Sequence, residues 1–426
     1  MFTLAVFIGI YSYVLMGLGL AGLMTAGWIG GVTAVFGLGS LVWMKSVKLN
    51  VKWTWWWAMI VVQALVNLVG TMGSELGFDA LWYHLTIPRI WLLEHKIFFI
   101  AKGPFYYSVM PKLVEMLYAA GLAMGSEIWA KAVHWGFGLL ATAVTYKLAR
   151  KFLDSKWSAF AAVIFYSNLV VAWQSITAYV DLGRTFFEAL ALYLMLDKKI
   201  YRSAIVLGLA ISTKLLAFGS LPIFVVILLA QKQKMKTILA YLAMAMAVCS
   251  PWLIYAYLMT GNPVYPIFSG YDLTFTKRIW DIITIWFRSA DPVSPIYASI
   301  FPLAVVYRKK LPVELIVYCL MAIGVWWLTP RTGGGRFLLP YLPVFSVVAA
   351  ATIAQCSMLK AQRFFVGTVL VIAVISIGYR AVANAKYWPE IIGRQTRQDF
   401  LDKNLDKNFG NNFFYLSNEK LKELYK

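Results

Sequence analysis

Residues 237–260 read TILAYLAMAMAVCSPWLIYAYLMT, an apolar run without a single charged side chain. An α-helix needs about 20 such residues to cross the ~30 Å hydrocarbon layer of a bilayer. Similar runs recur along the chain, so that 61% of its residues are hydrophobic and only 14% are charged. A soluble domain averages about 45–50% apolar and about 25% charged residues, so these side chains cannot all be buried in a soluble core. The sequence therefore predicts an all-α, polytopic bundle of transmembrane helices.

The basic residues, which give a net charge of +20, fall mainly in short gaps between the apolar runs. This placement indicates membrane topology and no nucleic-acid partner, because Lys and Arg collect in cytoplasmic loops. The gaps carry Lys45/Lys48/Lys52, Arg150/Lys151/Lys156, Lys198/Lys199/Arg202, Lys232/Lys234/Lys236 and Arg308/Lys309/Lys310. A cleaved signal peptide is not expected, because the first apolar run lacks a basic leader and a second run follows at once. The three Cys residues lie in or beside apolar runs without metal-like spacing, which argues against a disulfide framework or a zinc site.

With these gaps in the cytoplasm, parity predicts about thirteen crossings, an inner N-terminus and an outer C-terminus. Residues 1–382 would form the transmembrane domain, and residues 383–426 a short polar outer tail. A long outer loop, residues 73–126, is dense in polar and aromatic residues. Within it, apolar residues at helical spacing lie opposite Lys112 and Glu115, which predicts a helix in the membrane interface.

Asp79 is the first candidate for chemistry. It precedes Trp82, Tyr83 and His84 at the outer membrane surface, where a carboxylate is placed to act as a general base on a hydroxyl. Asp before an apolar run is also a favoured helix N-cap, so a structural role is the alternative. Asp181, in the second outer segment AYVDLGR, has the same two interpretations.

Cations expected on the outer side form a second group of candidates. Arg331 and Arg336 flank three glycines, and Gly-rich backbone beside guanidinium groups binds phosphate oxygens well. Lys214 lies at the predicted bend of a helical pair, residues 201–230, which has basic residues at both ends. These cations could instead reach lipid headgroups. The candidate substrate-binding residues are Tyr83, His84, Lys102, Lys214, Arg331 and Arg336.

Several motifs, in this order and on one expected side, resemble bacterial class C glycosyltransferases (GT-C). These are polyprenyl-phosphate-sugar-dependent membrane enzymes related to the lipid A aminoarabinose transferase and the protein O-mannosyltransferases. The motifs are FDALWYHLTIPR (78–89), YVDLGR (179–184), LGLAISTKLLAF (207–218), TGNPVYPIF (260–268) and RFLLPYLP (336–343). The segment GRQTRQDFLDKNL (393–405) is similar to the outer tail of that group.

The resemblance implies a GT-C-like fold and an inverting sugar transfer at the outer face of the cytoplasmic membrane. The donor would be a polyprenyl-phosphate sugar, and the acceptor a lipid, a glycan or a protein. Asp79 matches the acidic residue of the family's first loop, Tyr83 the tyrosine four positions on, and Asp181 the acidic residue of the second loop. Ala80 stands where family members often have a second acid, so a divalent metal cofactor stays open.

A transporter or flippase of lipid-linked sugars is the main alternative. Such a protein is expected to contain inverted repeats or paired broken helices near the bilayer midplane, and the sequence has one bent hairpin and no repeat. A polymerase or ligase that uses pyrophosphate-linked lipids is a third possibility, although its main outer loop usually comes late in the chain. Glu188, about two turns into a crossing, is either functional or paired with an Arg or Lys.

Overall fold

A computed structural model describes residues 1–44, 53–269, 279–286, 293–329, 331–356, 358–405 and 412–426. Within these ranges every regular element is a helix, so the all-α prediction is confirmed for the described chain. The longer helices are α1 (Phe2–Leu20), α2 (Ala26–Met44), α3 (Trp56–Met72), α5 (Leu113–Ala123), α6 (Glu127–Ala149), α7 (Ser155–Tyr166), α9 (Asp181–Leu196), α10 (Ile200–Thr213), α11 (Ser220–Ala230), α12 (Met235–Thr260), α14 (Ile296–Val306), α15 (Val313–Leu328), α16 (Leu342–Ala354) and α17 (Leu359–Asn384). Short elements that matter below are the π-helical turn η1 (Ala80–His84), α4 (Thr86–Leu93), α8 (Leu169–Gln174), η3 (Leu215–Gly219), η5 (Arg331–Tyr341), α18 (Trp388–Ile391), α19 (Arg397–Asn404), η7 (Phe413–Tyr415) and α20 (Asn418–Tyr425).

The chain is a membrane protein. Four described stretches are long and apolar enough to cross a bilayer: Phe2–Leu20, Met235–Thr260, Gly334–Ala354 and Lys360–Ile391. Shorter apolar helices of 10–17 residues accompany them, among them α3, α10, α11 and α15. The total of about thirteen crossings stays a prediction.

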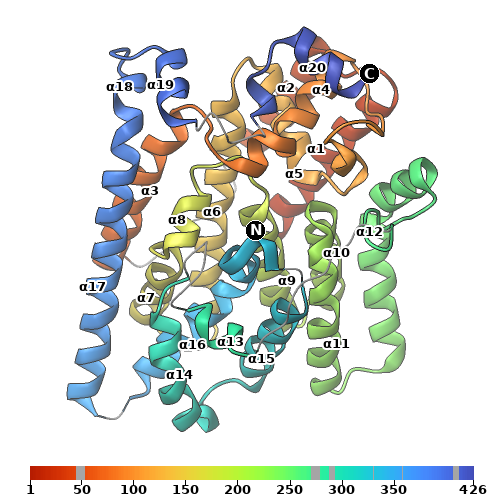
Figure 1. Cartoon of the computed structure of the whole chain (residues 1–426). Helices are drawn as coiled ribbons and strands as arrows, with labels where there is room; N and C mark the ends of the chain where they lie inside the picture. Colours follow the sequence, from red (N-terminus) through yellow and green to blue (C-terminus); the bar gives the residue numbers. More distant parts are fainter. Residues whose placement is uncertain (45–52, 270–278, 287–292, 330, 357, 406–411) are drawn as a thin grey trace.

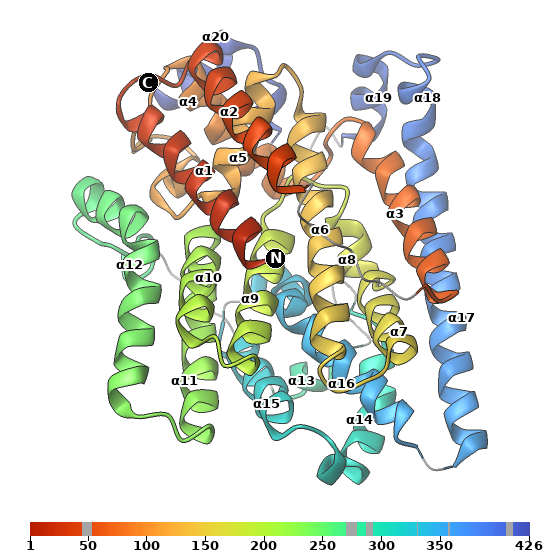
Figure 2. The ribbon, with the colours of Figure 1, turned by 180° about the vertical axis from the view of Figure 1, so that it is seen from behind.

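The centre of the bundle is α9, which packs against both α6 and α10. Its residues from Asp181 to Leu192 are all buried, as expected for a helix surrounded by other helices. Figures 1 and 2 show α17 running the full height of one side, beside α3, while α12 lies on the opposite side. The site described below lies near the beginning of α9.

The C-terminal tail packs against the 73–126 segment. In Figure 1 the two meet at the upper end of the molecule, where the blue α20 lies beside the orange α4. Arg89 donates hydrogen bonds to the carbonyl of Phe414 and, over 2.7 Å, to Oδ1 of Asn418. The hydroxyl of Tyr425 lies 2.7 Å from Glu94. The polar tail therefore contacts the loop that carries Asp79's motif.

Helix α5 differs from the expected amphipathic helix. Its residues from Leu113 to Gly121 are all buried, and so are Lys112 and Glu115, which the pattern placed on an opposite polar face. The two charges are 3.0 Å apart, so they neutralise each other inside the protein. The hydrophobic pattern was correct, but the two charges that were expected to be exposed are buried, with Glu115 also 2.9 Å from His84.

The predicted bend in the 201–230 pair is confirmed. Helix α10 ends at Thr213, Lys214 is extended with φ −157° and ψ 128°, and α11 begins at Ser220. Because this break interrupts the helix, the Lys214 side chain can leave the helical surface and reach a neighbouring element. The next section shows that it reaches Asp181.

Glu188 has the structural pairing that the sequence left open. Its carboxylate is 2.5 Å from Nε of Arg184 and accepts a hydrogen bond of 2.7 Å from Ser220, with both charged groups buried. Removing one member of a buried ion pair leaves the other charge uncompensated, which costs about 3–5 kcal/mol. Glu188→Ala should therefore lower the thermal unfolding midpoint of the purified protein sharply. The exposed Glu423→Ala is the control, and equal midpoints for the two variants would contradict the expectation.

Candidate active site

Four charged side chains from four separate segments meet at one cavity of about 1240 Å³. Asp79 comes from the segment before η1, and Asp181 from the first residue of α9. Lys214 comes from the break before η3, and Arg336 from η5. All four line the cavity or lie against its lining, so residues spread over more than half of the sequence reach one place.

The four charges form two linked ion pairs. Nη1 of Arg336 lies 2.7 Å from Oδ2 of Asp79, and Nζ of Lys214 lies 2.7 Å from Oδ1 of Asp181. Nε of Arg336 is also 3.9 Å from Oδ2 of Asp181, and among the described residues neither of these two atoms has a hydrogen-bond partner. The cluster carries two negative and two positive charges, so its formal charge is zero. Unused hydrogen-bonding capacity remains between Arg336 and Asp181.

Neither acid acts as a helix cap. Asp79 immediately precedes η1 but its side chain makes no capping hydrogen bond, and the residue before α9 is Val180. Both carboxylates are directed to cations instead. The helix-cap role that the sequence allowed for Asp79 and Asp181 is therefore wrong, and their part in chemistry stays a prediction.

The segment that carries Asp181 also contacts the main chain of Asp79 through Tyr179. The amide of Asp79 donates a hydrogen bond of 3.1 Å to the hydroxyl of Tyr179, and the guanidinium of Arg336 lies 4.8 Å from the centre of the Tyr179 ring. A cation over an aromatic face is attracted by the ring quadrupole. Tyr179 thus contacts both members of the Asp79–Arg336 pair.

Aromatic side chains cover the mouth of the cavity around Tyr83. Tyr83 and Trp82 line it together with Tyr107, whose ring centre is 4.8 Å from that of Tyr83. The indole of Trp82 is fixed by a hydrogen bond of 2.9 Å to the carbonyl of Pro104. Burial, followed by the charge of Asp79, raises the pKa of Tyr83 well above its ordinary value, so its hydroxyl stays protonated. Flat apolar faces next to charged groups suit a ligand that has both kinds of surface.

His84 joins the cavity wall without touching Asp79. Its Nδ1 lies 2.9 Å from Glu115, which also pairs with Lys112. Burial lowers the pKa of His84 although Glu115 opposes this, while Lys112 and His84 lower the pKa of Glu115 against the effect of its burial. His84 and Lys112 therefore both contact Oε1 of Glu115.

One predicted substrate-binding residue, Lys102, is not part of this cluster, and another, Arg331, cannot be compared with it. The ammonium of Lys102 donates to the main-chain oxygen of Lys426, 3.0 Å away, and Lys102 is not among the residues that line the cavity. The side chain of Arg331 lies outside the described residues. Arg336 is thus the member of the predicted Arg pair that the structure places at the site.

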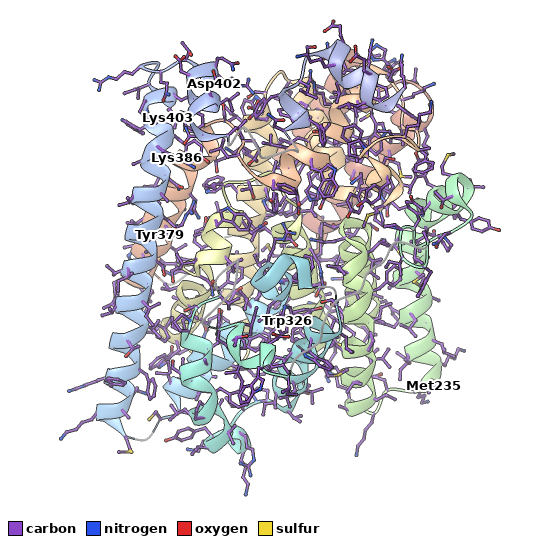
Figure 3. All side chains as sticks on the ribbon, viewed as in Figure 1. Met235, Trp326, Tyr379, Lys386, Asp402 and Lys403 are labelled. Atoms are coloured by element: carbon purple, nitrogen blue, oxygen red, sulfur yellow. The ribbon has the colours of Figure 1, made fainter. Side chains whose placement is uncertain are left out.

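Sequence analysis missed a group of polar residues contributed by the end of α17. Arg380, Asn384 and Lys386 line the cavity from this side, and Asn384 accepts a hydrogen bond of 2.7 Å from Arg380. Figure 3 shows Lys386 at the end of α17 that lies near α19, opposite the end of the molecule where Met235 lies. In the described part of the chain neither cation is paired with a carboxylate. The sequence signal that could have found them is the one that pointed to Arg336. These basic residues lie at the outer end of a predicted crossing, where the positive-inside rule disfavours them.

The acids of this site do not form a metal-binding group. Among the described residues, no three His, Cys, Asp or Glu side chains are placed to hold a metal ion together. Asp79 and Asp181 each have a basic partner at 2.7 Å, which a metal ion would have to displace. The residues present therefore favour a site that uses protein cations.

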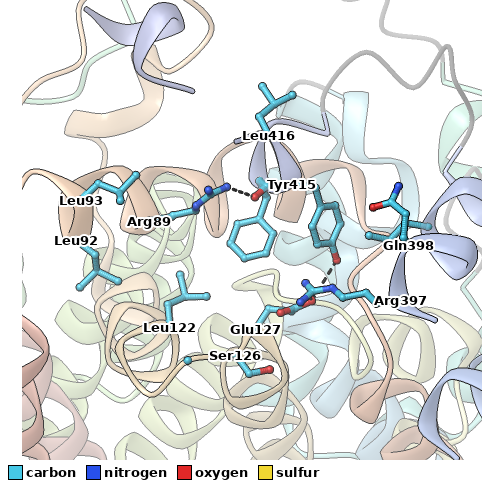
Figure 4. A pocket seen from close by; sticks show the side chains of 13 residues that line it. Arg89, Leu92, Leu93, Leu122, Ser126, Glu127, Arg397, Gln398, Tyr415 and Leu416 are labelled. Atoms are coloured by element: carbon cyan, nitrogen blue, oxygen red, sulfur yellow. Dashed lines mark hydrogen bonds and ion pairs between the residues drawn. The ribbon is translucent and has the colours of Figure 1, made fainter. Parts of the chain in front are cut away.

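A second hollow, of about 680 Å³, lies between the 73–126 segment and the tail. Figure 4 shows its wall, where Tyr415 and Arg397 approach Glu127, and Arg89 reaches the main chain of η7. Both of its arginines already have partners, Glu127 for Arg397 and Phe414 for Arg89. The wall is mainly the contact between tail and loop.

No protein-family model and no curated protein sequence matches this chain. Solved structures do match its fold. The crystal structure of ArnT from Cupriavidus metallidurans in the apo state matches with 17% sequence identity and a TM-score of 0.57. The match covers 79% of this chain and 68% of the ArnT chain. ArnT bound to undecaprenyl phosphate matches with 16% identity, a TM-score of 0.56 and coverage of 81% and 74%. The archaeal oligosaccharyltransferase AglB from Archaeoglobus fulgidus, in complex with an inhibitory peptide and a dolichol-phosphate, has 14% identity, a TM-score of 0.49 and coverage of 78% and 56%.

Proposed function

We propose, from the premise that this chain has the GT-C-like fold of ArnT, that it is a membrane glycosyltransferase using a polyprenyl-phosphate sugar as donor. The observation that carries the proposal is the convergence of Asp79, Asp181, Lys214 and Arg336 on one cavity. An anionic lipid headgroup and a reacting hydroxyl need cations and a carboxylate within reach of each other. ArnT, whose fold this chain shares, has been crystallised with undecaprenyl phosphate.

Sugar transfer would break the bond between C1 of the sugar and a phosphate oxygen, and form a bond between C1 and an acceptor oxygen. The acceptor attacks from the face opposite the phosphate, which inverts the configuration at C1. Its hydroxyl proton passes to the carboxylate of Asp79, and the polyprenyl phosphate leaves with the electron pair. The acceptor is a lipid, a glycan or a protein.

Arg336 and Lys214 would stabilise the negative charge that develops on the leaving phosphate. Preorganised charges in a water-poor site act strongly, at about 3–4 kcal/mol for a single donor. Asp181 holds both cations in place, since it contacts Lys214 at 2.7 Å and approaches Arg336 at 3.9 Å. Arg380 and Lys386 supply further positive charge on the opposite wall.

The pairing of Asp79 with Arg336 suggests how the donor would free the base. The carboxylate of Asp79 lies 2.7 Å from the guanidinium of Arg336. A donor phosphate competes for the same guanidinium and takes over part of its hydrogen bonds. The Asp79 carboxylate is then available to accept a hydrogen bond from the acceptor hydroxyl when the donor is present.

The reaction would take place at the outer face of the cytoplasmic membrane in a multi-pass domain, residues 1–382. The basic gaps of the sequence support this sidedness through the positive-inside rule. A lipid-linked donor also fits an outer site, because it needs no nucleotide-binding motif. Residues 383–426 form the outer tail in this arrangement.

The test is to incubate the purified protein with a panel of polyprenyl-phosphate sugars and a cell-envelope extract as the source of acceptors. We expect one donor to release free polyprenyl phosphate, and we expect no release with Asp79→Asn. The same donors in protein-containing vesicles test the alternative. Movement of an intact donor across the bilayer without cleavage would identify a flippase and overturn the proposal.

A further inference from the structure

Two buried side chains of α6, Lys131 and His134, contact the main chain of the segments that carry the two acids. They are three residues apart on the helix, with Glu127 four residues before Lys131, so the three side chains share one face. Lys131 and His134 are fully buried. The proposed chemistry uses neither of them.

Lys131 holds the segment that leads to Asp79. Its ammonium donates hydrogen bonds to three carbonyls at the end of α3, those of Gly70 at 2.8 Å, Gly73 at 2.6 Å and Ser74 at 3.3 Å. An ammonium has three N–H donors and no acceptor, so these contacts use its full capacity. A helix C-terminus also favours a positive charge, which offsets part of the cost of burying it.

His134 holds the segment that leads to Asp181. Its Nδ1 lies 2.8 Å from the carbonyl of Gln174 and 2.7 Å from that of Thr177, so Nδ1 carries the proton. Its Nε2 accepts a hydrogen bond of 3.0 Å from the amide of Leu182, so Nε2 carries none. One neutral imidazole tautomer therefore joins the main chain on both sides of Asp181.

Glu75 links the two held segments directly. Its Oε1 accepts from the amides of Leu76 at 2.9 Å and Gly77 at 2.6 Å, and its Oε2 accepts from the amide of Ala178 at 2.6 Å. The carboxylate therefore bridges the chain four residues before Asp79 to the chain three residues before Asp181. The tail reaches the same point, since the hydroxyl of Tyr415 donates to the Glu75 carbonyl over 3.0 Å.

We propose that Lys131 and His134 are positioning residues, which from one face of α6 fix the two acid-bearing segments and so set the placement of Asp79 and Asp181 around Arg336. This inference rests on the proposed sugar transfer. Displacement of a reacting group by about 1 Å can cost about 10²-fold in rate, so a main-chain shift in either segment would be felt in kcat. The donor's phosphate, held mainly by Lys214 and Arg336, would be bound almost as before.

The test compares His134→Asn with the wild type. An Asn side chain can still donate to the Gln174 and Thr177 carbonyls, but it offers the Leu182 amide no equivalent acceptor. We expect kcat to fall about 10- to 100-fold with the donor KM changed by less than about threefold, and the Leu182 amide to exchange with deuterium at least about tenfold faster. The control is His95→Asn, at an exposed position with φ 57° that Asn adopts readily.

Wild-type kcat in a variant whose Leu182 amide exchanges faster would overturn the inference. The inference would also be overturned if the loss of activity only reflects a smaller folded fraction of the variant, seen as faster hydrogen exchange along the whole chain. Glu75→Gln provides a second variant of nearly unchanged size, in which an NH2 group replaces one carboxylate oxygen and faces a main-chain N–H. It should show the same kcat loss, with faster exchange at Ala178. Absence of transfer by the wild type would instead overturn the proposed function, while unchanged exchange in both variants would overturn the positioning role by itself.

Discussion

Asp79→Asn is expected to lower the kcat of sugar transfer by about 10²- to 10⁴-fold, the usual contribution of a positioned general base. Asn has nearly the same shape but cannot accept the acceptor's proton. The substitution also releases Arg336 from its 2.7 Å ion pair, so the donor phosphate no longer competes with the carboxylate of Asp79. The donor KM should therefore stay the same or fall while kcat collapses. Release of polyprenyl phosphate, measured over a range of donor concentrations, separates the two constants.

The matched control is Asp402→Asn, an exposed aspartate on α19 that is not among the residues lining the cavity. Thermal unfolding of both variants should resemble that of the wild type, because Asp79 is not a helix cap. Transfer by purified Asp79→Asn at the wild-type rate would remove Asp79 as the base.

Arg336→Ala should lower kcat/KM by about 10²- to 10³-fold, as expected for loss of one preorganised donor to a developing charge. It should also weaken binding of free polyprenyl phosphate, because the guanidinium of Arg336 is one of the two groups proposed to bind the phosphate. Arg336→Lys should recover only part of the loss. The ammonium keeps the positive charge but lacks the planar guanidinium that binds two oxygens at once. Titration calorimetry with polyprenyl phosphate measures the binding part directly.

Arg363→Ala, an exposed arginine on α17 outside the cavity lining, controls for the loss of one positive charge. Because Arg336→Ala leaves the carboxylate of Asp79 without its ion-pair partner, its unfolding midpoint must be measured beside its activity. An unchanged donor KM and kcat in a folded Arg336→Ala variant would contradict the role of Arg336 in phosphate binding.

Much of the fold follows from local pattern. The apolar run of residues 237–260 predicted helix α12 within a few residues of its observed ends, because a run of apolar side chains forms a helix in a bilayer. The bend at Lys214 followed from charge parity alone. The polar face of α5 was predicted wrongly, since no local pattern reveals that Lys112 and Glu115 pair with each other inside the protein.

The candidate site was predictable as a set of residues and not as a geometry. Asp79, Asp181, Lys214 and Arg336 each stood out as a charge at the end of an apolar run, which is costly without a partner. Their pairing depends on packing between distant helices, which the sequence does not encode locally. Lys102 carried the same kind of signal but pairs with the tail, and Arg380 was counted as part of a crossing although its side chain faces the cavity.

The unpaired cations on the wall formed by α17 bear on how the catalytic cycle ends. In the proposed chemistry the donor is a phosphodiester with one negative charge. The spent carrier is a phosphate monoester, which carries about 1.5 to 2 negative charges. Arg380 and Lys386, which lack a carboxylate partner among the described residues, would attract the spent carrier more strongly than the donor. We therefore expect accumulated free carrier to act as a product inhibitor, which couples the rate of transfer to carrier recycling in the membrane.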